Sequence, residues 1–294
     1  MPLAEVRTFA KSLGGSPTNV AVGAARLGRR TAVITKVGRD GFGDYVRTAL
    51  ASFGVDTRWV GTDPTLRTPI VFCEIYPPDN FPVLFYREPK APDMNITVAD
   101  LDLAAIAAAP LFWTTGTGLS DEPSRGTTLA ALDARRRRDH TIHDLDYRHH
   151  LWRSLDEARR WSLEAVRRAT VVVGNTEEVE MATGLQEPRA AAAALLGLGA
   201  SLAIVKRGHE GVYARTARDE LTVPPVETRV LNGLGAGDAF GGALCHGLLA
   251  GWPLRQTLEV ANAAGAIVAS RLACADAMPT SAEIDALLAR RVAT

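Results

Sequence analysis

The sequence predicts an α/β protein whose doubly wound, mostly parallel sheet has helices on both faces and a small β-lid. The first observation is a set of short apolar, β-branched runs, each followed by a segment long enough for a crossover helix. These runs are residues 31–37, 111–115, 141–145, 170–173 and 202–206. Parallel strands that alternate with helices are typical of doubly wound sheets. The second observation is a change of pattern after residue 55, which predicts the lid.

Residues 56–87 differ because no helix-forming segment separates their strand-like runs. Those runs are 57–60, 69–76 and 83–86. Proline-containing turns divide them, which favours an antiparallel flap. We expect one domain over residues 1–294, in which about 1–15 and 56–92 form the lid.

Composition argues against several classes of protein. A chain of 294 residues that is 47% hydrophobic can bury a substantial core. Lys plus Arg equals Asp plus Glu at 33 each, so no overall charge favours nucleic acid or an acidic membrane surface. The basic run 135–138 precedes Asp139 at a predicted helix end, which favours a solvated helix cap. No apolar run approaches the roughly 20 residues that span a bilayer, and residues 1–11 lack a signal-peptide core.

The three cysteines provide a further indication. Cys73, Cys245 and Cys274 lie in apolar surroundings and do not have the spacing of metal ligands. This pattern predicts reduced thiols in a cytoplasmic protein.

The most informative local feature is the glycine-rich turn within residues 231–242. Glycines without a Cβ let the amides of Gly235, Ala236 and Gly237 converge, and the start of the following helix adds partial positive charge. Asp238 would lie in the first helical turn, where a carboxylate could take a proton from a hydroxyl while the amides hold phosphoryl oxygens. The alternative is a glycine turn capped by an aspartate, which is a common way to begin a helix.

This turn resembles the second signature of the ribokinase-like (PfkB) carbohydrate kinases, and residues 14–28 resemble the first. The resemblance extends over nearly the full chain. It implies an ATP-dependent kinase in which Asp238 is the catalytic base and the amides of residues 235–237 stabilise the transferred phosphate. The family's first signature contacts sugar hydroxyls, and the matching residues are Gly14, Gly15 and Asn19. The alternative for this segment is a glycine turn into a helix of small residues.

The same resemblance implies a nucleotide and magnesium site. Asn175 and Glu178 match the family's NxxE element and would hold Mg²⁺ and phosphate through water; a plain helix cap by Asn175 is the alternative. The turn at 206–211 resembles the family's ATP-side loop, and the small-residue helix around Asn262 resembles the one beside the adenine. Close helix packing by Ala and Gly is an alternative role for that helix and is compatible with the first. The nucleotide-binding residues implied are Asn175, Lys206, Gly208, Gly211, Gly235, Gly237 and Asn262.

Residues 143–152 resemble the DxNxR…LW pattern of the branch that phosphorylates keto-deoxy sugar acids. A guanidinium offers forked donors to a carboxylate, so Arg148 is expected to bind the acid, as are Tyr86 and Arg87 at the end of a lid strand. A surface ion pair is the alternative for each arginine. The resemblance implies phosphorylation of the terminal hydroxyl of 5-dehydro-2-deoxygluconate, an acid of inositol breakdown; 2-keto-3-deoxygluconate, fructose and ribose are alternative substrates. A homodimer contact through the lid is left open.

Two departures from the family pattern bear on these expectations. Asn232 stands where most members have an aspartate, so activation by a monovalent cation lacks its usual carboxylate. No segment before Gly14 has the pattern of the family's first strand, which carries a sugar-binding aspartate, and Met1 is interpreted as a late start. A kinase fold that binds ligand without turnover is therefore an alternative, against which the intact turn at 235–238 argues.

Overall fold

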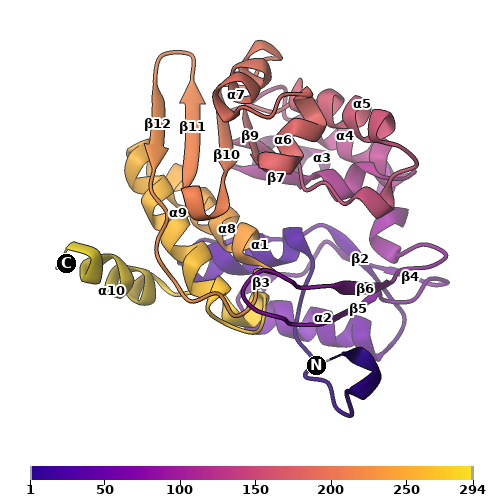
Figure 1. The fold of residues 1–294 in the computed structure, drawn as a ribbon. Coiled ribbons are helices and arrows are strands. Elements are labelled where there is room, and N and C mark those ends of the chain that lie inside the picture. Colours follow the sequence, from indigo (N-terminus) through magenta and orange to yellow (C-terminus); the bar gives the residue numbers. More distant parts are fainter. Residues whose placement is uncertain (1, 293–294) are drawn as a thin grey trace. The chain divides into compact units, whose positions relative to one another are not determined.

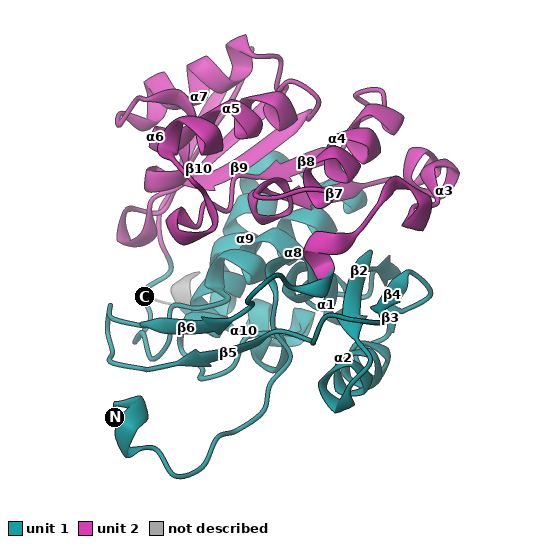
Figure 2. Ribbon diagram, turned by 90° about the vertical axis from the view of Figure 1, so that its right-hand side faces the viewer, with its two compact units in different colours: residues 1–92, 226–294 teal, residues 93–225 magenta. Residues whose placement is uncertain are grey.

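The computed structural model describes residues 2–292, which are drawn in Figure 1. These residues divide into two compact units (Figure 2). Unit 2 is the continuous segment Asp93–Pro225, and unit 1 combines the chain up to Pro92 with the chain from Val226 onward.

The sheet of unit 2 confirms the predicted α/β organisation. Its order is β12-β11-β10-β9-β8-β7, and β7 to β10 run parallel, whereas β11 and β12 join antiparallel at one edge. The strands are β7 (Phe112–Thr115), β8 (Thr141–Asp144), β9 (Val171–Asn175), β10 (Leu202–Lys206), β11 (Val212–Thr216) and β12 (Glu220–Val223). The four parallel strands coincide with four of the predicted runs.

The α-helices of unit 2 are α3 (Leu103–Ala108), α4 (Ser124–Ala134), α5 (Leu155–Val166), α6 (Thr176–Thr183) and α7 (Pro188–Gly197). Along the chain, α3 precedes β7, and the other α-helices of unit 2 lie between successive parallel strands. Val172 and Val205 of the sheet belong to one buried cluster with Val179 of α6 and Leu195 of α7. Their strand neighbour Val173 is fully buried as well, as expected for parallel strands that are covered on both faces.

Unit 1 contains the remaining α-helices of the described chain. They are α1 (Ser16–Arg26), α2 (Gly41–Ser52), α8 (Ala236–Ala250), α9 (Leu254–Ala269) and α10 (Ser281–Val292). Small residues bring α8 close to both α1 and α9. A Cβ on Gly242 would lie 2.9 Å from the Cα of Gly23 in α1, and a Cβ on Gly247 would lie 2.6 Å from the Thr257 side chain in α9. The glycines of α8 thus permit two close helix contacts.

The strands of unit 1 form three separate pairs. These are β1 (Thr31–Ala32) with β3 (Val55–Asp56), β2 (Thr35–Gly38) with β4 (Val60–Asp63), and β5 (Ile70–Cys73) with β6 (Val83–Tyr86). The first two pairs are parallel, and only the third is antiparallel. The predicted strand 31–37 is therefore two strands with different partners. The antiparallel flap is confirmed for β5 and β6, whereas its first segment was wrong, because β4 pairs in parallel with β2.

Residues 2–15 contain the 3₁₀ helix Leu3–Glu5 and no strand. The other 3₁₀ helices are Pro92–Asn95, Val98–Asp100, Gly116–Leu119, His149–Leu151, Gly208–Glu210 and Ala275–Ala277.

The basic run after α4 is partly buried, so the expected solvated cap is wrong for Arg135. This side chain is 2% exposed, and its guanidinium donates to the carbonyls of Ile106 and Asp139 and to the Thr141 hydroxyl, each at 3.0 Å. Arg135 thereby links the end of α3 to the start of β8.

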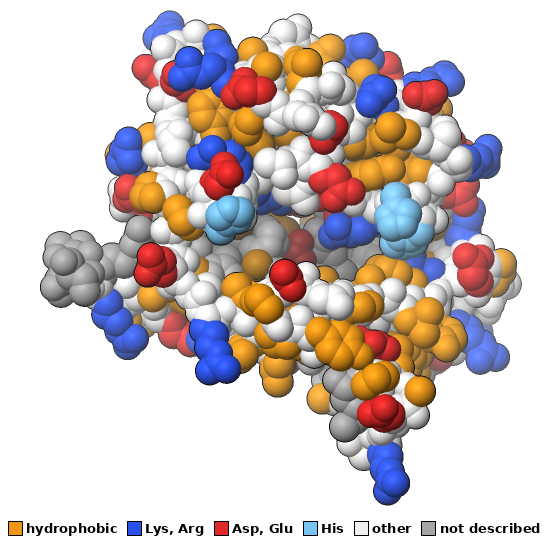
Figure 3. Space-filling model, in the orientation of Figure 1, with side chains coloured by type: hydrophobic (Ala, Val, Ile, Leu, Met, Phe, Trp, Pro, Cys, Tyr) orange, Lys and Arg blue, Asp and Glu red, His pale blue; other side chains and the backbone are white. Residues whose placement is uncertain are grey.

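Acidic and basic side chains are interspersed over the face shown in Figure 3. None of the helices described has both the length and the apolar character needed to cross a membrane.

Candidate active site

The glycine turn before α8 has a conformation that only glycine adopts readily. Gly235 has φ 83°, in the left-handed region, and a Cβ there would lie 3.1 to 3.2 Å from the Cys274 side chain. The turn places Ala236, Gly237 and Asp238 in the first turn of α8, where the backbone amides have no acceptor within the helix. These amides and the helix dipole favour an anion at this point.

Asp238 joins the two motifs that lie far apart in the sequence. Its Oδ1 accepts a hydrogen bond from the Ser16 hydroxyl and its Oδ2 accepts one from Asn19 Nδ2, both at 2.7 Å. Asn19 is 3% exposed, and its Oδ1 is buried without a hydrogen-bond partner among the described residues. The first turns of α1 and α8 therefore meet at this carboxylate. The Asn19 amide nitrogen, expected at a sugar hydroxyl, is directed at Asp238.

Of the two glycines before α1, only Gly15 has a backbone conformation that favours glycine. Gly15 has φ 95°, whereas a Cβ on Gly14 would meet no atom within 4 Å. Both glycines are exposed. The open space beside Gly14 is consistent with the approach of a ligand, but packing gives no reason for glycine at that position.

Two further residues shape the turn of unit 1. Asn232 is 2% exposed; its Nδ2 donates to the Leu272 carbonyl, and its Oδ1 accepts from the Leu234 amide. Asn232 thus braces the turn against the chain at residue 272. Burial and the Asp238 charge raise the pKa of Cys274 to about 12, so this thiol is neutral at physiological pH.

In unit 2, the carboxyl ends of three parallel strands bring charged groups together. Asp144 ends β8, Asn175 ends β9 and Lys206 ends β10. Lys206 Nζ lies 3.7 Å from Asp144 Oδ1, and the two side chains are only 17% and 4% exposed. Burial raises the pKa of Asp144 to about 7; the Lys206 charge opposes this, and the Glu178 charge adds to it. The sequence reasoning assigned no role to Asp144.

Asn175 and Glu178 form a capping box at the start of α6. The Glu178 amide donates to Asn175 Oδ1 at 2.9 Å, and the Asn175 amide donates to Glu178 Oε2 at 2.6 Å. The helix-cap alternative is thus what the structure shows, and Glu178 is 4% exposed. Within residues 2–292, no three His, Cys, Asp or Glu side chains are grouped so as to hold a metal. Mg²⁺ commonly keeps its waters and uses one carboxylate with substrate phosphates, so Glu178 fits an ion held through water.

The two glycines after β10 differ in what they require. A Cβ on Gly211, which has φ 83°, would lie 2.1 Å from the Val223 carbonyl, so strand pairing alone accounts for this glycine. Gly208 has φ 56°, and a Cβ there would enter open space. Gly208 is therefore the better candidate for a close approach of the nucleotide.

The arginines expected at the acid lie in different units. In unit 2, Arg148 is held by Asp146, at 3.0 Å from nitrogen to oxygen, and is 48% exposed. Asp146 is 5% exposed and also accepts from the Thr117 hydroxyl at 2.7 Å. In unit 1, Arg87 follows Tyr86, which is 60% exposed at the end of β6.

Asn262 lies on α9 and is half-buried. A Cβ on Gly265, three residues further along, would lie 3.1 Å from the Ala236 carbonyl. The small residues of α9 therefore do serve close packing against the first turn of α8. That packing places Asn262 on a helix beside the glycine turn.

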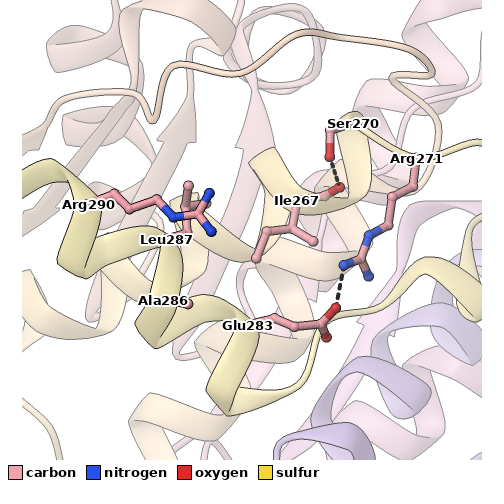
Figure 4. A pocket seen from close by; sticks show the side chains of 7 residues that line it. All are labelled: Ile267, Ser270, Arg271, Glu283, Ala286, Leu287 and Arg290. Atoms are coloured by element: carbon pink, nitrogen blue, oxygen red, sulfur yellow. Dashed lines mark hydrogen bonds and ion pairs between the residues drawn. The ribbon is translucent and has the colours of Figure 1, made fainter.

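A separate pocket of about 250 Å³ lies in unit 1 between α9 and α10 (Figure 4). Its lining residues are Ile267, Ser270, Arg271, Glu283, Ala286, Leu287 and Arg290. Arg271 pairs with Glu283, and hydrogen bonds from Thr280 and Arg271 lower the pKa of Glu283 to about 2. None of the predicted site residues lines this pocket, so it is distinct from the site around Asp238.

A carboxylate in the first turn of a helix that begins in a glycine turn, on an α/β fold, is the arrangement that a phosphoryl-transfer enzyme needs. The chain belongs to the pfkB family of carbohydrate kinases, whose model matches residues 2–281. It is 34% identical to a 5-dehydro-2-deoxygluconokinase from Geobacillus kaustophilus, over 97% of this chain and 87% of that protein. It is 32% identical to another from Clostridium botulinum, over 97% and 86%. The protein is a sugar kinase, as predicted.

Solved structures agree with this family and confirm the ribokinase-like fold. A PfkB protein from Polaromonas sp. superposes with a TM-score of 0.87 at 28% identity, covering 97% of this chain and 93% of that one. A fructokinase from Xylella fastidiosa with bound ATP has a TM-score of 0.87 at 25% identity, covering 99% and 94%. A sugar kinase from Pyrococcus horikoshii in complex with ATP has a TM-score of 0.82 at 27% identity, covering 98% and 94%.

Proposed function

We propose that the protein transfers the γ-phosphoryl group of ATP to the terminal hydroxyl of 5-dehydro-2-deoxygluconate. The relatives that carry this activity in their names, at 32 to 34% identity over nearly the whole chain, support the substrate. The observation that carries the reaction is the Asp238 carboxylate, which both α1 and α8 fix beside the turn at 235–237.

In this reaction Asp238 accepts the proton of the terminal hydroxyl as its oxygen bonds to phosphorus. The bond from phosphorus to the bridging oxygen of ATP breaks, and ADP leaves. The amides of Gly235, Ala236 and Gly237 donate to the phosphoryl oxygens on which negative charge is spread. Mg²⁺, when bound, neutralises phosphate charge. These groups act on developing charge and therefore raise turnover more than ground-state binding.

We assign the following residues to nucleotide binding. Lys206 supplies a positive charge for phosphate, and its Nζ lies 3.7 Å from Asp144 Oδ1. Gly208 leaves room for the nucleotide, while Gly211 shapes the same turn through its contact with β12. Glu178 holds Mg²⁺ through water. Further nucleotide contacts are assigned to Asn175, Gly235, Gly237 and Asn262.

Recognition of the acid is assigned to Arg148, Arg87 and Tyr86, and recognition of the sugar hydroxyls to Gly14, Gly15 and Asn19. Arg148 is paired with Asp146 and is 48% exposed, and a guanidinium can bind a carboxylate through two parallel N–H groups. The buried Oδ1 of Asn19 is the acceptor that a sugar hydroxyl could reach once the site rearranges around its substrate.

The substrate assignment is tested by measuring ADP release with three candidate acceptors. 5-Dehydro-2-deoxygluconate is expected to give the highest kcat/KM, followed by 2-keto-3-deoxygluconate and then fructose. A higher kcat/KM for 2-keto-3-deoxygluconate would transfer the assignment to that acid. A higher value for fructose would remove acid recognition from the account, and ADP release with none of the three would favour a binding protein.

We propose that the β5–β6 hairpin forms a contact between two copies of this chain. Leu84 and Tyr86 are 46% and 60% exposed. They lie on the same face of the hairpin as their cross-strand partners, Phe72 and Ile70. Val71 and Val83 are exposed on its other face, so the hairpin offers apolar surface on both sides. Sedimentation velocity should show a dimer that Leu84→Glu converts to a monomer. A parent that sediments as a monomer at micromolar concentration would contradict this contact.

A further assignment concerns the cellular compartment. The three free cysteines support a reducing compartment, and we place the enzyme in the cytoplasm.

Both polar groups of Asn232 bind backbone atoms of the protein, and an amide brings no negative charge to a monovalent cation. We therefore expect turnover to be equal in potassium and in tetramethylammonium salts. A several-fold stimulation by potassium would contradict this assignment.

A further inference from the structure

Ser16 contacts the proposed base directly, yet no part of the proposed reaction accounts for it. It is the first residue of α1, and its hydroxyl donates to Asp238 Oδ1 at 2.7 Å. Asn19 lies three residues further on, which is the same face of the helix, and donates to the other oxygen. Each oxygen of the carboxylate therefore receives a donor from α1, and the plane of the carboxylate is fixed.

Helix packing alone does not explain this contact. One turn beyond Asn19 and Asp238, α1 and α8 meet at Gly23 and Gly242, and a Cβ on Gly242 would lie 2.9 to 3.0 Å from the backbone of residues 23 and 24. The α1 residues around this point are buried, Val22 completely. The close backbone approach and the apolar burial hold the two helices together without the Ser16 hydroxyl.

We propose that Ser16 is a positioning residue for the catalytic carboxylate, which it orients and keeps ionised for proton abstraction. This inference rests on the proposed function, because it needs Asp238 to act as the base. A hydrogen bond to the ionised form of a carboxylate favours that form, and a fixed orientation directs its remaining lone pairs at the incoming hydroxyl. Ser16 itself need not touch the substrate.

Asp238 lies near other titratable groups that do not favour its ionised form. Burial, together with the charges of Asp238, Cys73 and Asp276, raises the pKa of the Cys274 thiol, so this thiol is neutral and Asp276 is a second carboxylate. On α1 the charged residue is Arg26, in its last turn. The donors that α1 supplies to the carboxylate, Ser16 and Asn19, favour the ionised form.

The test compares Ser16→Ala and Ser16→Thr with the parent and with Ser52→Ala. Ser52 is a matched control, since its exposed hydroxyl donates only to the Ala49 carbonyl of its own helix. For Ser16→Ala we expect kcat to fall about 10-fold or more, with KM for ATP within about two-fold of the parent. The acidic limb of the kcat profile should move to higher pH by about one unit, because a carboxylate that loses a donor binds its proton more tightly. Ser16→Thr keeps the hydroxyl and should restore most of the activity and the parent profile.

An unchanged kcat and pH profile in Ser16→Ala would overturn the proposal. So would a fall in kcat that comes with a lower melting temperature, an unmoved acidic limb and no rescue by threonine, since that pattern indicates a structural role. If the parent phosphorylates a neutral sugar in place of the acid, only the substrate assignment fails, and the same comparison is made on that sugar.

Discussion

Asn19 and Asp238 are 219 residues apart in the sequence, and a 2.7 Å hydrogen bond from Nδ2 to Oδ2 joins them. Together with the Ser16 contact, this bond makes the start of α1 part of the machinery around the base. Substitutions at the N-terminal motif should therefore change the chemical step as well as substrate binding.

Asn19→Asp tests this connection. The substitution places a second carboxylate beside Asp238, and two carboxylates at this distance share a proton at neutral pH. We expect kcat at pH 7 to fall by roughly 10-fold or more and to recover in part as the pH rises. A kcat profile that keeps the parent shape would show that the Asn19 contact has no influence on the base.

Gly235→Ala should destabilise unit 1 and disturb the turn. The alanine would be held at φ 83° with its Cβ within 3.2 Å of Cys274, and we expect a loss of about 1 to 3 kcal/mol in the free energy of unfolding. Gly41→Ala is the control, since that glycine begins α2 with open space beside it and no positive φ. Thermal unfolding of both variants makes the comparison, and equal melting temperatures would contradict the strain.

Asp144 should make stability depend on pH. Its pKa of about 7 lies above the value of about 3.9 in an unfolded chain, so between those values the folded protein holds a proton that the unfolded chain has released. This contribution to stability is present at low pH and is lost as the pH rises towards and through 7. The melting temperature of Asp144→Asn, relative to the parent, should therefore rise from pH 5 to pH 8. A constant difference over that range would mean that Asp144 stays ionised beside Lys206.

Arg87→Leu should impair phosphorylation of a sugar acid far more than that of a neutral ketose such as fructose. With the acid, the substitution removes a charge-assisted hydrogen bond to the carboxylate, worth about 1.5 to 3 kcal/mol. A neutral ketose has no carboxylate and therefore makes no such bond. The measurement is the ratio of kcat/KM in the variant to kcat/KM in the parent, determined once for the sugar acid and once for fructose. Equal losses on both sugars would exclude Arg87 from acid recognition.

Much of the fold could be predicted because buried parallel strands have a strong sequence pattern. The ends of β8 and β10 coincide closely with the predicted runs, and Lys206 lies at a strand end as expected. Partners in the sheet were harder to predict. The run 31–37 divides into β1 and β2, since its two halves pair with β3 and β4, and no periodicity within the run distinguishes these partners.

The candidate site could be predicted where a motif holds it within one segment. The turn at 235–238 is local, and its glycine requirement follows from its own conformation. The roles of Ser16 and Asp144 depend on partners 222 and 62 residues away, and no spacing rule connects such pairs. Gly211 matched the family's nucleotide-side turn in the sequence, but the structure gives a different reason for this glycine. A Cβ at residue 211 would clash with the Val223 carbonyl.

The most direct test of the account is turnover by Asp238→Asn. Asparagine keeps the size of the side chain but cannot accept the hydroxyl proton, so kcat with the sugar acid should fall by roughly 10²-fold or more. The dissociation constant for ATP, measured by isothermal titration calorimetry, should stay within a few-fold of the parent value. Turnover within a few-fold of the parent would remove Asp238 from the mechanism and would contradict the central claim.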